Sequence, residues 1–208
     1  MKPIRDIIVR VEKTHKQTIK TESGFELLLD ENIKQVKDTI RHGEVVAVPD
    51  DMPWDVRVGD ELYFHHGIVG ETVLNDQPNL ESQYLIDREK HMFTVPTDKY
   101  WPMAYAILRD EKFQALNGVC FVRPIIHKKY STDLYIPNNE EELKSIGEMV
   151  YSNDNLRDQG VDDGTKVVFS KDSEYKFDIN GETLYAMFDR WILGVYKLPT
   201  HAKRWGGL

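Results

Sequence analysis

Short hydrophobic runs, each bounded by glycine, proline or aspartate, recur along the chain. Runs rich in β-branched, aromatic and leucine residues between turn signals predict β-strands. They lie at residues 7–11, 43–48, 55–60, 61–64, 93–95, 105–108, 119–123, 148–151, 166–169 and 183–188. Helical periodicity is weak, and only the short segments 33–40 and 140–146 are predicted to be helical. The pattern therefore indicates an all-β fold.

The order of these runs repeats within the chain. In each half, a strand that ends in arginine is followed by a polar segment with an apolar cluster, then by a Gly-Glu pair, and then by a glycine corner. The landmarks are Arg10, residues 27–29, Gly43-Glu44 and Gly59-Asp60 in the first half, and Arg123, residues 134–136, Gly147-Glu148 and Gly164-Thr165 in the second. We therefore predict two tandem domains, 1–108 and 117–198, joined by the charged segment 109–117 and followed by a tail at 199–208.

Composition and charge exclude several classes of function. The chain has 208 residues and a formal net charge of −8, and without a basic stripe it is not expected to bind nucleic acid. The single cysteine, Cys120, excludes an internal disulfide, and its apolar neighbours predict a buried thiol. No run is long enough to cross a bilayer, and residues 1–6 lack the apolar stretch of a secretion leader. We expect a cytoplasmic protein without a membrane partner.

Enzyme signatures are missing from the sequence. It contains no phosphate-binding P-loop, no nucleophile elbow and no zinc-protease motif. The adjacent pair His65-His66 is the strongest candidate for a metal site, but neighbours on a strand point to opposite faces and do not chelate one ion together. We interpret the pair as a solvated turn before Gly67, and we predict no enzymatic activity, no cofactor and no metal.

Several segments resemble the GroES, or chaperonin-10, family of co-chaperonins. They are the opening strand at 4–11, RHGEVVAV at 41–48, DVRVGDELYF at 55–64, and the closing segments 181–187 and 192–195. The resemblance implies two tandem GroES-like small β-barrels. Both copies lack the hairpin that roofs the dome in many members, at 49–55 and at 152–161, as in phage-type members, and the first copy carries extra sequence at 71–89. The resemblance implies a cytoplasmic protein. If the protein is encoded by a phage, the implied location is the cytoplasm of the host cell.

The resemblance implies a lid that caps a chaperonin ring through mobile loops and encloses a folding client protein. The first loop spans about 14–40, and its polar residues cannot bury enough apolar surface to order it when free. The chaperonin-binding residues would be Phe25, Leu27, Leu28, Leu29, Leu134, Tyr135 and Ile136. In the alternative interpretation, residues 27–29 form a buried strand, and the choice between binding and burial is equally open for residues 134–136. A second alternative is a structural or assembly protein that kept the fold but no longer binds a chaperonin.

The resemblance also implies assembly. In the family, the first strand of one domain pairs with the last strand of its neighbour to close a ring. We expect one such joint inside the chain, between the strand ending near 108 and that starting near 119. The other, between 7–11 and 191–196, requires another chain, so we predict a ring-shaped homo-oligomer. Either the first copies form a seven-membered ring with the second copies as an added tier, or the ring holds an even number of domains.

Overall fold

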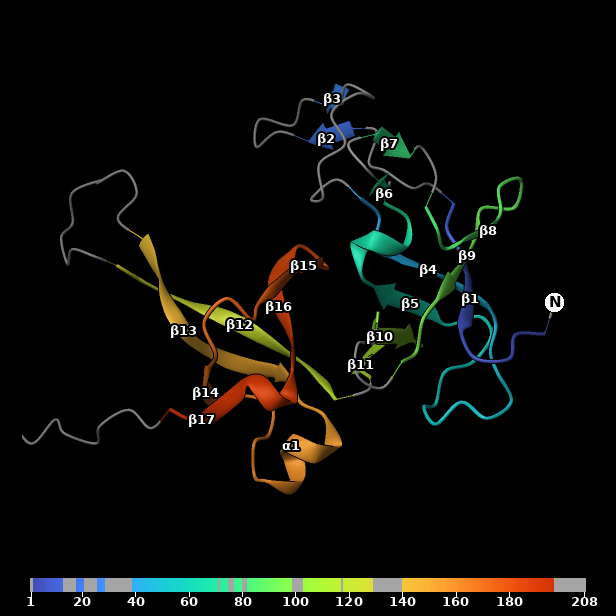
Figure 1. The fold of residues 1–208 in the computed structure, drawn as a ribbon. Helices are drawn as coiled ribbons and strands as arrows, with labels where there is room; N and C mark the ends of the chain where they lie inside the picture. Colours follow the sequence, from blue (N-terminus) through green and yellow to red (C-terminus); the bar gives the residue numbers. More distant parts are fainter. Residues whose placement is uncertain are drawn as a thin grey trace, which may run out of the picture. The chain divides into compact units, whose positions relative to one another are not determined.

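A computed structural model describes residues 2–12, 18–20, 26–28, 39–70, 72–74, 77–79, 82–98, 103–116, 118–128 and 140–196. The chain divides into two compact units, Met1–Asn117 and Gly118–Leu208. Strands joined by turns build both units (Figure 1), which confirms the all-β prediction. No helix among the described residues is long and apolar enough to span a membrane.

Unit 1 is a seven-stranded antiparallel sheet in the order β11-β10-β5-β4-β1-β9-β8. Its strands are β1 (Ile7–Arg10), β4 (His42–Ala47), β5 (Glu61–Phe64), β8 (Leu85–Asp87), β9 (Met92–Val95), β10 (Ala104–Arg109) and β11 (Lys112–Ala115). Two separate hairpins pair β2 (Thr18–Lys20) with β3 (Glu26–Leu28) and β6 (Thr72–Leu74) with β7 (Gln77–Asn79), and a short 3-10 turn, η2, covers His66–Ile68.

Unit 2 is a six-stranded antiparallel sheet in the order β15-β16-β12-β13-β14-β17. Its elements are β12 (Val119–Lys128), β13 (Glu140–Tyr151), the helix α1 (Asp154–Asp158), β14 (Lys166–Phe169), β15 (Tyr175–Ile179), β16 (Glu182–Phe188), the 3-10 turn η3 (Asp189–Trp191) and β17 (Ile192–Val195). Each sheet carries its own core. One is built around buried Val9, Leu62 and Phe64, and the other around Val122, Met149 and Phe169.

The two sheets share one strand order. The six strands β1, β4, β5, β8, β9 and β10 of unit 1 lie in space as β10-β5-β4-β1-β9-β8, and the six strands of unit 2, taken in chain order, lie in the same sequence, β17-β14-β13-β12-β16-β15. The register agrees as well, because Arg10 pairs with Glu44 and Arg123 with Glu148. The repeated landmarks of the sequence thus occupy corresponding places in two sheets.

The repeated glycines explain why these landmarks recur. A Cβ on Gly147 would lie 2.7 Å from the Arg123 carbonyl oxygen, and one on Gly43 would lie 2.7 Å from that of Arg10. At the following corner the Val45 amide donates to the Asp60 carbonyl at 2.8 Å, and the Met149 amide donates to that of Thr165 at 2.8 Å. The Gly-Glu pairs therefore permit close strand approach in both units.

Three local predictions are wrong. Residues 55–60 form a turn rather than a strand, because the Asp60 amide donates to the Arg57 carbonyl at 3.1 Å. Segment 140–146 is part of strand β13, since pairing with β12 overrides its weak helical periodicity. Strand β11 lies in the segment that we read as a linker. Segment 152–161, predicted to lack the roof hairpin, contains the short helix α1, whose Asn153 side chain accepts from the Leu156 amide. Segment 33–40 falls outside the described residues except for Thr39 and Ile40, which are not helical.

The predicted strand joints also need correction. Strand β1 pairs with β4 on one side and β9 on the other, so residues 7–10 have no free edge for another chain. Strand β10 pairs with β5 and β11, and β12 pairs with β13 and β16, so no direct joint links the strands at 108 and 119. Within the described residues both sheets end in edge strands and do not close into barrels by strand pairing.

Candidate functional site

The segment predicted to bind a chaperonin lies between β1 and β4, so the chain leaves the seven-stranded sheet of unit 1 after β1 and rejoins it at β4. Within it, Leu27 lies opposite Ile19 and Leu28 opposite Thr18 in the β2–β3 hairpin, which pairs with no strand of the seven-stranded sheet among the described residues. Figure 1 shows this hairpin away from β1 and β4. The backbone of residues 26–28 is therefore extended, but not as a strand of the sheet. Phe25 and Leu29 lie outside the described residues.

The second predicted segment joins β12 to β13 in unit 2. These strands run on as a pair to Lys128 and Glu140, and the chain between them contains Leu134, Tyr135 and Ile136. All three lie outside the described residues, as does the tail at 199–208. The two segments thus emerge at equivalent points, between the first and second strands of equivalent sheets.

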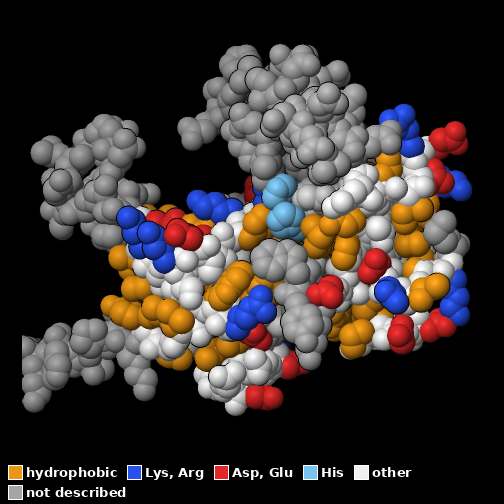
Figure 2. All heavy atoms as spheres, viewed as in Figure 1, with side chains coloured by type: hydrophobic (Ala, Val, Ile, Leu, Met, Phe, Trp, Pro, Cys, Tyr) orange, Lys and Arg blue, Asp and Glu red, His pale blue; other side chains and the backbone are white. Residues whose placement is uncertain are grey.

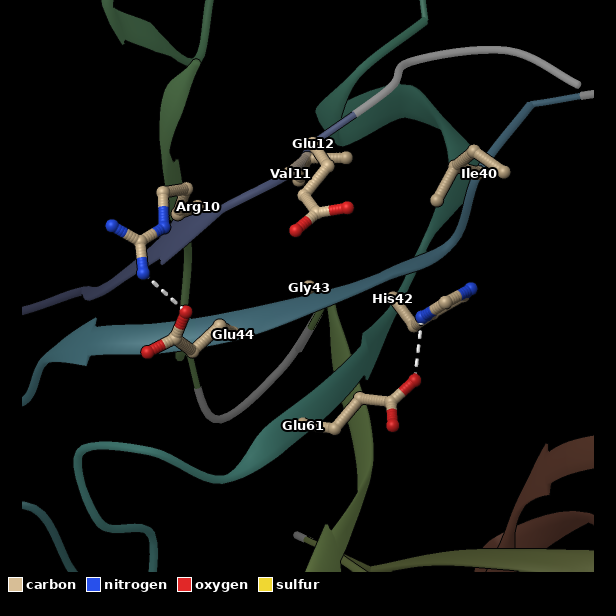
Figure 3. Close-up of a pocket in the computed structure, with 8 residues that line it drawn as sticks. All are labelled: Arg10, Val11, Glu12, Ile40, His42, Gly43, Glu44 and Glu61. Carbon is tan, nitrogen blue, oxygen red and sulfur yellow. Dashed lines mark hydrogen bonds and ion pairs between the residues drawn. The ribbon is translucent and has the colours of Figure 1, made fainter. Parts of the chain in front are cut away.

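A pocket of about 360 Å³ lies where the first segment leaves and rejoins the sheet. Figure 3 shows the carboxylate of Glu12 beside Val11, pointing toward the strand that carries Gly43, with Ile40 at another side of the pocket. Two pairs border the pocket: Arg10 with Glu44, and His42 Nδ1 with Glu61 Oε1 at 2.5 Å. The arrangement offers apolar surface with a charged rim, which suits binding or orienting a peptide segment.

The described residues contain no cluster of histidine, cysteine, aspartate or glutamate able to hold a metal ion. Cys120 is buried, as predicted, and burial raises the pKa of its thiol. His65 is the N-cap of the 3-10 turn that begins at His66, and the two ring centroids are 4.1 Å apart. Burial, followed by the charges of His66 and Arg41, lowers the pKa of His65 to about 4. The pair lies at a turn before Gly67, as predicted, but the two rings are half-buried rather than fully solvated.

Sequence reasoning missed a carboxylate–arginine network in unit 1. Arg109, at the end of β10, donates through Nε and Nη2 to the two carboxylate oxygens of Asp60, each at 2.7 Å, and through Nη1 to Asp55 at 2.7 Å. Burial opposes the ionisation of Asp60, but hydrogen bonds from Arg109 and the Arg57 amide keep its pKa below the usual value. The network braces the glycine corner against β10. The only sign of this network in the sequence was the aspartate of the Gly59-Asp60 corner, a carboxylate that needs a partner if it is buried.

Unit 2 ends in an open strand edge. Strand β17 pairs with β14 and with no other described strand, and Leu193 and Val195 are 66% and 44% exposed. Figure 2 shows hydrophobic side chains on the part of unit 2 where Figure 1 places β17. Exposed apolar residues on an unpaired edge favour pairing with another strand.

Searches of protein-family models and of curated proteins found no match to this chain. The functional interpretation therefore rests on the two sheets, the segments that emerge from them and their open edges.

Proposed function

We propose that the protein is a co-chaperonin of the GroES type, in which two tandem antiparallel-sheet domains cap a chaperonin ring and enclose a folding client protein. One observation carries the proposal. Two sheets of the same strand order each send out a segment between the first and second strands, and each segment contains an apolar cluster between polar residues. A repeated scaffold with a connecting segment at the same place in both copies suits a lid with several contact points.

The contacts would come from Phe25, Leu27, Leu28 and Leu29, and from Leu134, Tyr135 and Ile136 in the second copy. A leucine side chain that becomes fully buried in an apolar groove contributes roughly 1.5–3 kcal/mol. Ordering about a dozen residues opposes this by an amount similar to or larger than one or two leucines provide. Each contact is then weak, and an assembly that presents several contacts binds through avidity. Weak contacts in number allow a lid to bind and leave in each cycle.

The pocket at the root of the first segment supports this role. The strands from which the segment leaves and to which it returns are held by the β1–β4 and β4–β5 ladders, and the pairs Arg10–Glu44 and His42–Glu61 lie on these ladders beside the pocket. Fixed ends limit the directions in which the segment can extend, and so reduce the ordering cost on binding.

Assembly into a homo-oligomer belongs to the same proposal. Strand β11, which directly precedes the first strand of unit 2, pairs with β10. In the repeat, β17 occupies the place of β10, and residues 2–5, which precede β1, occupy the place of β11. The equivalent pair is therefore residues 2–5 with β17. Residues 2–5 take part in no strand pairing in the described structure, and Ile4 is 84% exposed. We therefore place residues 2–5 of one chain against β17 of the next, in place of the joint through β1.

The alternative function is a structural or assembly protein with the same fold. The open edge of β17 favours it, because that edge serves assembly whether or not a chaperonin is bound. The two functions differ in the role of residues 25–29.

Co-sedimentation with a GroEL-type chaperonin, with and without nucleotide, tests the proposal. We expect nucleotide-dependent binding by the parent chain and at least tenfold weaker binding by Leu28→Asp, because an unpaired charge in an apolar groove costs several kcal/mol. Val58→Asp, at a position 65% exposed in the glycine corner, is the matched control and should bind as the parent does. No binding by a folded parent chain would favour the assembly protein. A Leu28→Asp chain that unfolds at a much lower temperature would identify the leucine as core.

A further inference from the structure

The β12–β13 ladder contains an irregular step. Pro124 pairs with Gly147, and the next pair is Ile126 with Glu142, so β12 advances by two residues while β13 advances by five. Inside this step Ser145 has a φ of 58°, in the left-handed region that non-glycine residues rarely adopt. The strand therefore bulges between Glu142 and Gly147, which interrupts the ladder and re-aims the strand beyond it.

Beyond the bulge the two strands continue without a third. Strand β16 pairs with β12 only over residues 119–122, and β14 pairs with β13 only over residues 146–148. Residues 126–128 and 140–142 thus form a two-stranded ribbon, which Figure 1 shows extending past β14 and β16 within unit 2. A two-stranded ribbon is marginally stable alone, so its direction depends on what holds its base.

One hydrogen bond ties the ribbon base to the sheet. The Tyr185 hydroxyl, on β16, donates to Glu142 Oε2 at 2.5 Å. Tyr185 is 2% exposed and is therefore fixed in the core, while the carboxylate belongs to the ribbon. Burial and then the hydrogen bond to Glu142 raise the pKa of Tyr185, so the phenol remains a donor near neutral pH. A hydrogen bond to a carboxylate is stronger than one between neutral groups.

Open space adjoins this contact. A cleft of about 420 Å³ lies between the ribbon base at Glu142, Lys144 and Ser145 and the opposite wall at Lys171, Asp172 and Glu174. Lysines and carboxylates occur on both walls, so the cleft is a polar space into which the ribbon base could move.

We propose that the bulge at residues 143–146 is a hinge and that the Tyr185–Glu142 hydrogen bond is a latch that fixes the direction of the ribbon. Tyr185 is then a positioning residue for the ribbon. Without the latch, the ribbon pivots at Ser145 toward the cleft while the six-stranded sheet stays intact. The inference concerns unit 2 alone and does not depend on chaperonin binding.

Hydrogen–deuterium exchange of the full chain tests the latch. Tyr185→Phe removes only the hydroxyl, and we expect amide exchange in 126–128 and 140–142 to rise about 10- to 100-fold, in keeping with the loss of one hydrogen bond to a charged group. Exchange in β14, and in residues 119–122 of β12, which pair with β16, should not change. Tyr175→Phe, on the adjacent β15, is the matched control and should leave ribbon exchange unaltered. Glu142→Gln, which keeps a neutral acceptor, should give an intermediate rise.

Two results would overturn the inference. Ribbon exchange that is the same in Tyr185→Phe as in the parent would show that the hydroxyl does not hold the ribbon. A uniform rise across all strands of unit 2 would show that the hydroxyl stabilises the sheet as a whole.

Discussion

Asp60 shows how one side chain connects three parts of unit 1. Its carboxylate is buried, accepts two hydrogen bonds from Arg109, and also accepts from the Arg57 amide at 2.8 Å. Breaking a buried ion pair by removing one partner leaves the other charge uncompensated. The corner, β5 and β10 should therefore lose stability together.

We predict that Asp60→Asn lowers the free energy of unfolding by about 2–4 kcal/mol, less than a fully buried pair because Asp55 still neutralises Arg109. Urea unfolding followed by tryptophan fluorescence measures the change. Asp87→Asn, which weakens the exposed pair with Lys90 at 3.7 Å, is the control and should cost less than about 1 kcal/mol. Equal losses in the two variants would contradict the role of the network.

His65 predicts a pH dependence of stability. Burial lowers its pKa from the ordinary 6.5 to about 4, so the unfolded chain binds more protons than the folded chain between these values. The free energy of unfolding should therefore fall, by about 1–3 kcal/mol, as the pH decreases from 6.5 to 4.

In the parent chain, the Gly67 amide donates a hydrogen bond to His65 Nδ1 at 3.1 Å. His65→Asn keeps an acceptor for this amide but removes the titrating ring, so it should flatten the pH dependence. Thermal unfolding at a series of pH values measures it, with the exposed His91→Asn as control. An unchanged pH profile in His65→Asn would assign the dependence to other groups.

At the scale of elements, the close approach of paired strands fixes the register of both sheets. A Cβ on Gly147 would stand 2.2 Å from Val122 Cγ1 as well as against the Arg123 carbonyl. The backbone of β12 cannot move away without weakening its pairs with β16. Strand pairing and core packing therefore both resist a side chain at this position.

We predict that Gly147→Ala destabilises unit 2 by about 1–3 kcal/mol, the usual range for overpacking. Gly194→Ala is the matched control on β17: its Cβ would meet nothing within 4 Å, and the change should be near neutral. Differential scanning calorimetry compares the two variants. A neutral Gly147→Ala would mean that the β12–β13 pairing tolerates a wider spacing.

At the scale of the whole molecule, the proposed joint between chains uses two segments that lie at opposite ends of the chain. Residues 2–5 lack a partner strand in the described structure, and β17 has one open edge with exposed Leu193 and Val195. In the repeat, β10 corresponds to β17 and β11 corresponds to residues 2–5. The pairing of β10 with β11 is thus the equivalent joint, formed inside the chain. Head-to-tail pairing of chains would join the two segments and closes into a ring if the rotation permits.

We predict that the parent chain sediments as an oligomer at micromolar concentration and that Val195→Lys shifts it toward monomer, since a lysine on an edge strand opposes pairing. Val58→Lys, on an exposed valine outside any strand, should leave the mass unchanged. A stable parent monomer would refute the assembly. A seven-chain assembly would favour a ring of first domains with the second domains as an added tier. A three- or four-chain assembly would favour a single ring that holds an even number of domains.

The sequence by itself determined the strands whose alternation and turn signals agree with their final pairing. Runs such as 166–169 and 93–95 became β14 and β9, because their residues pack well on a pleated surface in any neighbourhood. The repeated Gly-Glu and glycine-corner landmarks likewise indicated two copies of one arrangement, because a side chain is excluded there by backbone geometry that a sequence pattern records.

Only the tertiary structure decided the rest. Segment 140–146 has helical spacing, and pairing with β12 made it a strand; β11, with the sequence Lys-Phe-Gln-Ala, contains no β-branched residue to signal a strand and exists because β10 offers an edge. The Arg109–Asp60 network and the Tyr185–Glu142 contact join residues 49 and 43 positions apart. Such contacts depend on where the sheet brings distant strands, and local patterns of hydrophobic and polar residues carry no information about that distance.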